Sequence, residues 1–163
     1  MADVKKLKVV LIKSGCQRIG GGSDKRLIKS LSVRVHTTTR IFRETNQDIS
    51  ISICIEIWEP LIPKKWTYQQ KKIFYKDAYL AVIVGASKDF GNYGIVRDLR
   101  NNTDEASFQL GKDNVVILGD PSMGGGRKGA WSEGMIGHTG ENGREVLEQI
   151  QDIALEKYLK RIL

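Results

Sequence analysis

Cysteine is scarce in this chain of 163 residues, which contains only Cys16 and Cys54. Two cysteines are too few for a disulfide framework, and their separation has no metal-ligand pattern, so we predict no metal site. A reducing compartment is therefore expected. Proline is also scarce, with three residues, which argues against long disordered tracts.

Long apolar runs are missing as well. The amino terminus has no apolar core of signal-peptide length, and no uncharged stretch reaches the roughly 18 apolar residues of a membrane span. We therefore expect a cytoplasmic protein with no membrane partner. Histidine is limited to His36 and His138, and we interpret each as structural or exposed rather than catalytic.

The composition is ordinary for one globular domain, with 40% hydrophobic and 28% charged residues. The length is near that of a single domain with its own core, so we expect one domain over residues 1–163. The formal charge of +7 favours anionic partners. The basic residues are scattered and form no array with aromatic residues, which favours a solvated basic surface over a nucleic-acid interface.

Short apolar runs predict the strands. Residues 7–12, 78–84 and 115–118 are runs bounded by turn residues, which is typical of strands buried on both faces of a parallel sheet. Isoleucines alternate with polar residues over 49–57 and predict a further strand at an edge or in a half-covered position. Cys54 is then a small strand residue.

The spacing of other apolar residues predicts helices. One begins after Ser23 or Asp24, either of which would cap it, and it presents a stripe of Leu27, Ile28 and Leu31. Valines and threonines later in this segment disfavour a helix, so we assign no secondary structure to its second half. Further helices are predicted within residues 58–76, 95–101 and 143–163.

Aromatic residues gather in the segment 58–76. They are candidates to cover the sheet or a ligand, and core packing is the favoured interpretation. The same segment is our candidate contact surface for a homo-oligomer. These residues are Trp66, Tyr68, Phe74 and Tyr75.

Glycine-rich loops follow the three buried strands. In open α/β sheets, loops after the carboxyl ends of strands converge in the crevice that binds ligands. The first loop, residues 13–24, precedes a predicted helix, so free amides and the positive end of its dipole would face an anion such as phosphate. A purely structural turn is the alternative, because the loop has no P-loop lysine and no clean dinucleotide fingerprint.

A thiol in the same loop raises a different chemistry. Cys16, at the amino end of a helix, would have a depressed pKa and act as a nucleophile. Thiol phosphatases need Cys-x5-Arg followed by Ser or Thr, and here Gly22 stands at the arginine position, before Ser23. Without that arginine the transferring phosphoryl group lacks its main stabilisation, and the phosphatase hypothesis is set aside.

The three loops resemble, in order and chemistry, those of flavodoxin-like NADPH-dependent FMN reductases, which include quinone and chromate reductases. The resemblance covers about residues 7–136. In the first loop, Gly15-Cys16-Gln17-Arg18 and Ser23-Asp24 stand where the family has Gly-Ser-x-Arg and Ser-x-Asn. In the second, Ala86-Ser87-Lys88 matches in spacing without the family's prolines. The third is the closest match, through Gly111-Lys112 and Gly124-Gly125-Gly126-Arg127.

The resemblance implies a fold and an activity. The fold is α/β, a doubly wound parallel five-stranded sheet of flavodoxin-like topology. The cofactors are FMN and NADPH, and the activity is ping-pong oxidoreduction that passes hydride to flavin, quinone or a similar small-molecule electron acceptor. Family members are often homo-oligomers. No catalytic side chain is demanded.

The implied cofactor-binding residues all lie in or next to the three loops. They are Ser14, Gly15, Cys16, Arg18, Ser23, Asp24, Ala86, Ser87, Lys88, Asp89, Phe90, Ser122, Gly124, Gly125 and Gly126. The departures from the family pattern fall on the residues that shape the flavin-ring pocket. A flavodoxin-like nucleotide-binding or interaction module without redox activity is therefore the alternative.

Overall fold

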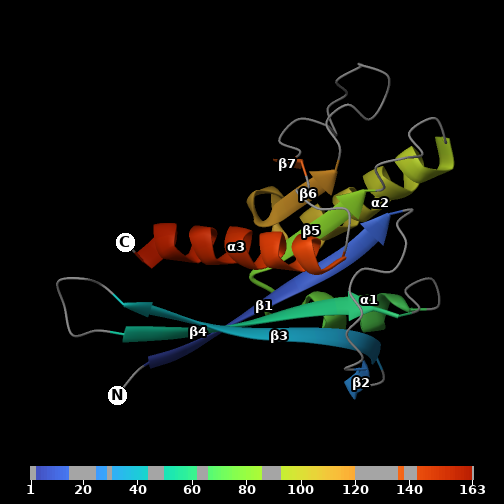
Figure 1. Cartoon of the computed structure of the whole chain (residues 1–163). Coiled ribbons are helices and arrows are strands. Elements are labelled where there is room, and N and C mark those ends of the chain that lie inside the picture. The colour runs from blue at the N-terminus through green and yellow to red at the C-terminus, as the bar shows by residue number, and fades with distance from the viewer. Residues whose placement is uncertain are drawn as a thin grey trace.

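The computed structural model describes residues 3–14, 25–28, 31–43, 50–61, 66–85, 93–119, 136–137 and 143–162. These residues form seven strands, three α-helices and one 3-10 helix (Figure 1). In chain order they are β1 (Asp3–Ser14), β2 (Lys25–Ile28), β3 (Leu31–Arg43), β4 (Ser50–Pro60), α1 (Tyr68–Tyr75), β5 (Leu80–Gly85), α2 (Tyr93–Leu110), η2 (Lys112–Asn114), β6 (Val115–Gly119), β7 (Ile136–Gly137) and α3 (Gly143–Ile162).

The strands form one mixed sheet in the order β2-β3-β4-β1-β5-β6-β7. The five strands from β4 to β7 in this order are parallel, whereas β2 and β3 are antiparallel to their neighbours. The protein is therefore an α/β protein with a mostly parallel sheet. The short apolar runs did predict β1, β5 and β6, because those strands have neighbours on both sides and lie between layers of helices.

The strand β4 was predicted from its alternating isoleucines at an edge or in a half-covered position, and the half-covered position is the one that the structure has. It lies between β1 and β3, and it pairs with β3 from Val33 opposite Pro60 to Arg43 opposite Ser50. Ile53, Ile55 and Ile57 are fully buried, while Ser52 and Cys54 on the other side are half-buried. A strand can thus be internal in hydrogen bonding and still keep one face partly open.

The helix predicted after Asp24 is the main error of the sequence analysis. The chain forms β2 and β3 there, which pair from Lys25 opposite Arg34 to Ile28 opposite Leu31. Val33, Val35 and the threonines that follow are β-branched and favour extended backbone. The first loop therefore leads into a strand, and the helix amino terminus expected to face a phosphate, or to activate a thiol, does not follow it.

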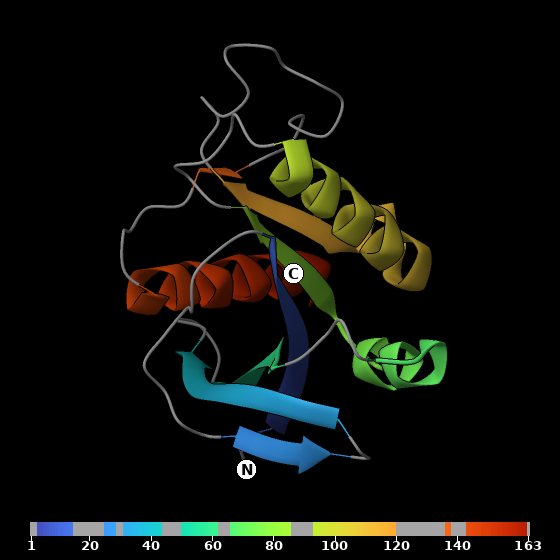
Figure 2. The ribbon, with the colours of Figure 1, turned by 90° about the vertical axis from the view of Figure 1, so that its right-hand side faces the viewer.

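Helices cover both faces of the sheet, with α3 on one side and α1 and α2 on the other (Figure 2). Strand β1 shows why: Val9 and Leu11 pack toward α3, and Val10 and Ile12 pack toward α1 and α2. Each such side chain, once fully buried, contributes about 1.5–3 kcal/mol to folding. The two apolar layers on either side of β1 are the core of the molecule.

The aromatic residues of the α1 region belong mainly to this core, as predicted. Phe74 and Tyr75 are buried, and the Phe74 ring lies 5.0 Å from that of Trp66 and 5.3 Å from that of Tyr75. Tyr68 is exposed. A capping box begins α1, because the Thr67 hydroxyl accepts from the Gln70 amide and the Gln70 side chain accepts from the Thr67 amide.

Helix α3 runs antiparallel to the parallel strands. Near its end, Lys157 donates to the Asp113 carbonyl at 2.6 Å and Arg161 to the Asn114 side chain at 3.3 Å, just before β6 starts. Its start therefore lies toward the carboxyl ends of the strands, and its end lies on the side where β1 starts (Figure 1). Among the helices the structure describes, none is apolar enough over a sufficient length to cross a membrane.

Candidate functional site

The three glycine-rich loops leave the sheet at one edge. Ser14, the last residue of β1, pairs with Gly85, the last residue of β5, and Val84 pairs with Leu118 near the end of β6. Because these strands are parallel, the loops that follow them start side by side at their carboxyl ends. We call this side of the sheet the carboxyl edge.

The connections place a topological switch point at this edge. The chain leaves β1 toward β4 on one side, and it leaves the neighbouring strand β5 toward β6 on the other side. A crevice opens outside the strands where connections diverge in this way, and open α/β sheets bind ligands there. Here that position is the carboxyl end of β1 and β5.

Most of the predicted cofactor-binding residues lie outside the described residues. Ser14 is the exception, as the last residue of β1. The others are Gly15, Cys16, Arg18, Ser23, Asp24, Ala86, Ser87, Lys88, Asp89, Phe90, Ser122, Gly124, Gly125 and Gly126.

A group of charged side chains lies buried next to the same edge, and the sequence analysis did not predict it. This edge charge cluster consists of Lys13 on β1, Arg34 and His36 on β3, and Glu59 on β4. Glu59 is 1% exposed and Arg34 is 2% exposed. The strand register brings these residues together, because Arg34 pairs directly opposite Glu59 in the sheet.

Glu59 is the centre of the cluster. Lys13 Nζ lies 2.6 Å from one carboxylate oxygen, and the His36 ring nitrogen Nε2 donates to the other at 3.2 Å. Arg34 Nη1 lies 3.9 Å from that second oxygen, beyond hydrogen-bond distance, and Arg34 Nε has no hydrogen-bond partner among the residues that the structure describes. Glu59 is therefore well satisfied, whereas Arg34 is not.

Burial alone would raise the pKa of the Glu59 carboxyl, because it disfavours the charged form. Hydrogen bonds from His36 and Lys13, together with their charges, outweigh burial and hold the pKa of Glu59 below its ordinary value of 4.5. Glu59 is thus ionised at neutral pH. Two permanent cations face this one carboxylate, so the cluster carries surplus positive charge.

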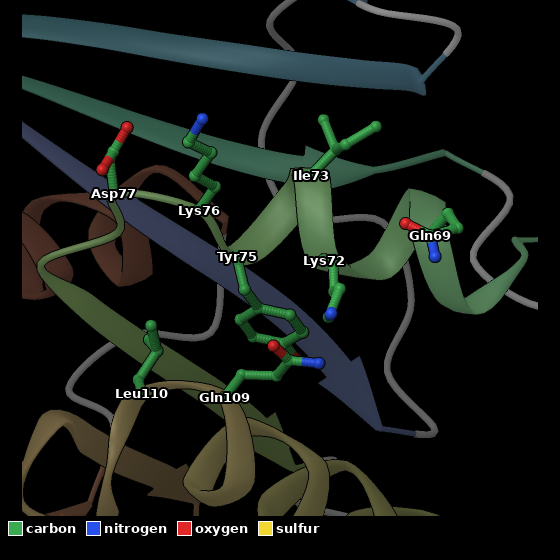
Figure 3. Close-up of a pocket in the computed structure, with 8 residues that line it drawn as sticks. All are labelled: Gln69, Lys72, Ile73, Tyr75, Lys76, Asp77, Gln109 and Leu110. Atoms are coloured by element: carbon green, nitrogen blue, oxygen red, sulfur yellow. The ribbon is translucent and has the colours of Figure 1, made fainter.

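Two hollows lie elsewhere on the molecule. One of about 370 Å³ separates the carboxyl ends of α1 and α2 (Figure 3). Figure 3 shows the Tyr75 ring directed toward α2 between these helices, and burial, followed by the charge of Glu105, raises the pKa of the Tyr75 hydroxyl. The hollow is lined by Gln69, Lys72, Ile73, Tyr75, Lys76, Asp77, Gln109 and Leu110.

The second hollow, of about 310 Å³, lies on the face of the sheet that α1 adjoins. Lys8 extends across it, with Nζ 4.0 Å from the centre of the Trp58 ring and 2.8 Å from the Lys76 carbonyl. Both hollows adjoin the turn at Lys76 and Asp77, which precedes β5. They therefore lie away from the carboxyl edge and from the edge charge cluster.

Metal-binding groups do not gather in the described part of the chain, where no three His, Cys, Asp or Glu side chains lie close enough to hold an ion. Cys54 is a free, half-buried thiol on β4, as expected of a small strand residue. His36 contacts the buried carboxylate of Glu59. His138 lies outside the described residues.

The sequence does contain a signal for the edge charge cluster. In β4 the buried residues Ile53, Ile55 and Ile57 are followed at the same spacing by Glu59, and in β1 the buried Val9 and Leu11 are followed by Lys13. A charge that continues a buried apolar face needs a partner. Arg34 could not be paired with them while its segment was expected to begin as a helix.

Comparison of the chain with known proteins gives no assignment, because no protein-family model matches it and no curated protein matches it in sequence.

Proposed function

We propose that this protein binds a phosphorylated nucleotide at the carboxyl edge, between β1 and β5, with FMN as the first candidate. The observation that carries the proposal is the register of the strand ends, since three glycine-rich loops start from one edge at a topological switch point. Read by chain position, the five parallel strands follow the order 2-1-3-4-5, which flavodoxin-like proteins share. Surplus positive charge near the edge favours an anionic ligand.

Fit to FMN has one feature against it and one for it. Residues 25–28 are strand, so the helix amino terminus that would face the phosphate after the first loop is missing. Lys13, directly before Ser14, offers a cation at the same edge instead. In this proposal the phosphate is held partly by side chains of the sheet.

Redox activity follows if the nucleotide is FMN. The flavin supplies hydride chemistry, accepting from NADPH and passing electrons to a flavin, a quinone or a similar small acceptor, while the protein binds and orients it. The second candidate is a nucleotide-binding module without redox activity. The replacement of the first crossover helix by β2 and β3 favours this second candidate, because it changes the part of the site nearest the phosphate.

The test is a titration of the purified protein with FMN, AMP and ATP by calorimetry, with flavin absorbance and NADPH oxidation as further readouts. Saturable FMN binding with NADPH oxidation supports the oxidoreductase. Binding of AMP or ATP without NADPH oxidation supports the module. A ligand at 100 times its Kd should also raise the unfolding free energy by about 2.7 kcal/mol. Failure of all three nucleotides to bind contradicts the proposal.

A pair of matched variants locates the site. Ser14→Asp adds a negative charge at the end of β1, and we expect it to weaken nucleotide binding at least tenfold by repelling the phosphate. Thr39→Asp adds the same charge to an exposed position of β3, opposite Cys54 and away from the carboxyl edge. Equal affinities of the two variants would contradict the proposed location.

A further inference from the structure

We infer that Arg34, together with Lys13, forms a binding site for a phosphate group at the carboxyl edge. The inference rests on the proposed function and deepens it, because it assigns the residues that hold the anionic end of the ligand. Arg34 lies outside the predicted loops, and Lys13 is the first residue of the first predicted loop. The edge charge cluster carries the argument.

Arg34 is the unusual member of the cluster. Its guanidinium is permanently charged and presents five N–H donors, yet the residue is 2% exposed and its Nε has no hydrogen-bond partner in the described part of the chain. The nearest oxygen of Glu59 lies 3.9 Å from Nη1. A buried donor without an acceptor destabilises the fold by about 1–3 kcal/mol, and more when it is charged. A buried polar group without a partner in a native fold calls for an explanation, and a missing ligand is one.

Glu59 cannot remove this imbalance. Its two oxygens already accept from Lys13 at 2.6 Å and from His36 at 3.2 Å. The pKa of Glu59 is lowered chiefly by these two partners against the effect of burial. Within the described ranges Arg34 therefore has no anion of its own, and a ligand with several oxygens would supply one.

The surroundings of the cluster favour phosphate. Gln151 of α3 donates to Thr38 at 2.6 Å, so Thr38 lies on the face of β3 that α3 covers. His36 and Arg34 lie on the same face, each one step nearer the carboxyl edge. Since α3 is antiparallel to the parallel strands, its first residues extend in the same direction, and the positive end of its dipole adds to the field there. A guanidinium fork matches two phosphate oxygens.

Access is provided through Lys13. Its side chain is 20% exposed, compared with 2% for that of Arg34, and it directly precedes the last residue of β1. An anion that approaches the carboxyl edge would meet the Lys13 ammonium first. We place the phosphate between this ammonium and the Arg34 guanidinium. Glu59, on the strand between them, holds β1 and β3 in register.

The experiment measures thermal unfolding and calorimetric binding of inorganic phosphate and pyrophosphate at constant ionic strength. Chloride serves as the monovalent control anion. Phosphate and pyrophosphate should raise the Tm of the wild-type protein, and chloride should not. For Arg34→Met, which keeps most of the side-chain volume, we expect the affinity for pyrophosphate to fall at least tenfold. Its Tm without anion should be equal to or above that of the wild type, because an unpaired buried charge has been removed.

Two further variants sharpen the result. Lys13→Met changes a partly exposed residue and should also weaken pyrophosphate binding at least tenfold. Arg40→Met is the matched control, because Arg40 lies on the same face of β3 but pairs with Asp152 at 3.6 Å near the other end of the strand. Its pyrophosphate affinity should equal that of the wild type.

The outcomes separate this inference from the proposed function. If nucleotides bind but Arg34→Met and Lys13→Met bind them and pyrophosphate as the wild type does, the inference is wrong and the proposed function stands. If pyrophosphate binds in an Arg34-dependent way but no nucleotide binds, the inference stands and the proposed function fails. A strongly lowered Tm of Arg34→Met without anion would assign Arg34 to a structural pair with Glu59 and overturn the inference.

Discussion

Glu59 is the residue on which the carboxyl side of the sheet depends most. It lies on the middle of three strands, and the other two supply its partners, Lys13 from β1 and His36 from β3. Its carboxylate therefore connects the parallel body of the sheet to the antiparallel extension. Removing the charge would leave the buried Arg34 guanidinium and the partly exposed Lys13 ammonium without the carboxylate that both now face.

We expect Glu59→Gln to lower the unfolding free energy by about 3 kcal/mol at pH 7, as when one partner of a buried ion pair is removed. Denaturant unfolding measures this value. The matched control is Glu56→Gln on the same strand, whose partner Lys6 is mostly exposed, so its loss should stay below about 1 kcal/mol. If both variants lost the same unfolding free energy, the edge charge cluster would contribute no more to stability than an exposed ion pair.

The lowered pKa of Glu59 also makes the stability of the fold depend on pH. A carboxyl whose pKa is depressed in the folded state contributes stability that is fully present above its ordinary value of 4.5, and this contribution is lost as the pH falls through the folded-state pKa. The stability difference between wild type and Glu59→Gln should therefore be constant near pH 7 and shrink below pH 4.5. A difference that grows on acidification would contradict this assignment.

At the scale of elements, helix α1 offers a local test. Its first turn relies on the reciprocal bonds between Thr67 and Gln70. We expect Thr67→Ala to lower the unfolding free energy by about 1 kcal/mol, while Thr67→Ser, which keeps the hydroxyl, stays near the wild-type value. Chemical denaturation of the three proteins decides between these outcomes. Equal destabilisation by both substitutions would mean that the methyl group, and not the cap, matters.

The sequence predicted those elements whose pattern is decided locally. Short apolar runs located β1, β5 and β6, and regular apolar spacing located α3. The failure at β2 has a physical cause, since Leu27, Ile28 and Leu31 suit one face of a helix as well as they suit a hairpin. Pairing of β3 with β4, which are distant in the sequence, makes this segment extended. A pattern read over a short stretch of sequence cannot report such pairing.

The same limit applied to the candidate site. The edge from which the loops start followed from the order of strands and loops, so Ser14 and Gly85 do meet there as expected. In the edge charge cluster, each partner of Glu59 lies 23 or more positions away from it in the sequence, and the cluster spans three strands. Arg34 and Glu59 became neighbours only through the antiparallel register of β3 and β4.

For the whole molecule, the sheet order predicts a gradient of local stability. Strands β1 and β5 lie inside the sheet between two helical layers, whereas β2 and β7 are short edge strands. We expect native-state hydrogen exchange to be slowest for β1 and β5, whose amides should exchange only through global unfolding. It should be fastest for β2, whose amides should exchange through local openings of lower free energy. Uniform exchange across all strands would contradict this layered core.

The antiparallel course of α3 has a practical consequence for experiments. Because α3 ends near the start of β6, and β1 starts on that same side, both described ends of the chain point away from the carboxyl edge (Figure 1). An affinity tag, fluorophore or sensor-chip linker attached at either end would leave the carboxyl edge turned outward. Immobilised protein should therefore report the same affinities as protein free in solution.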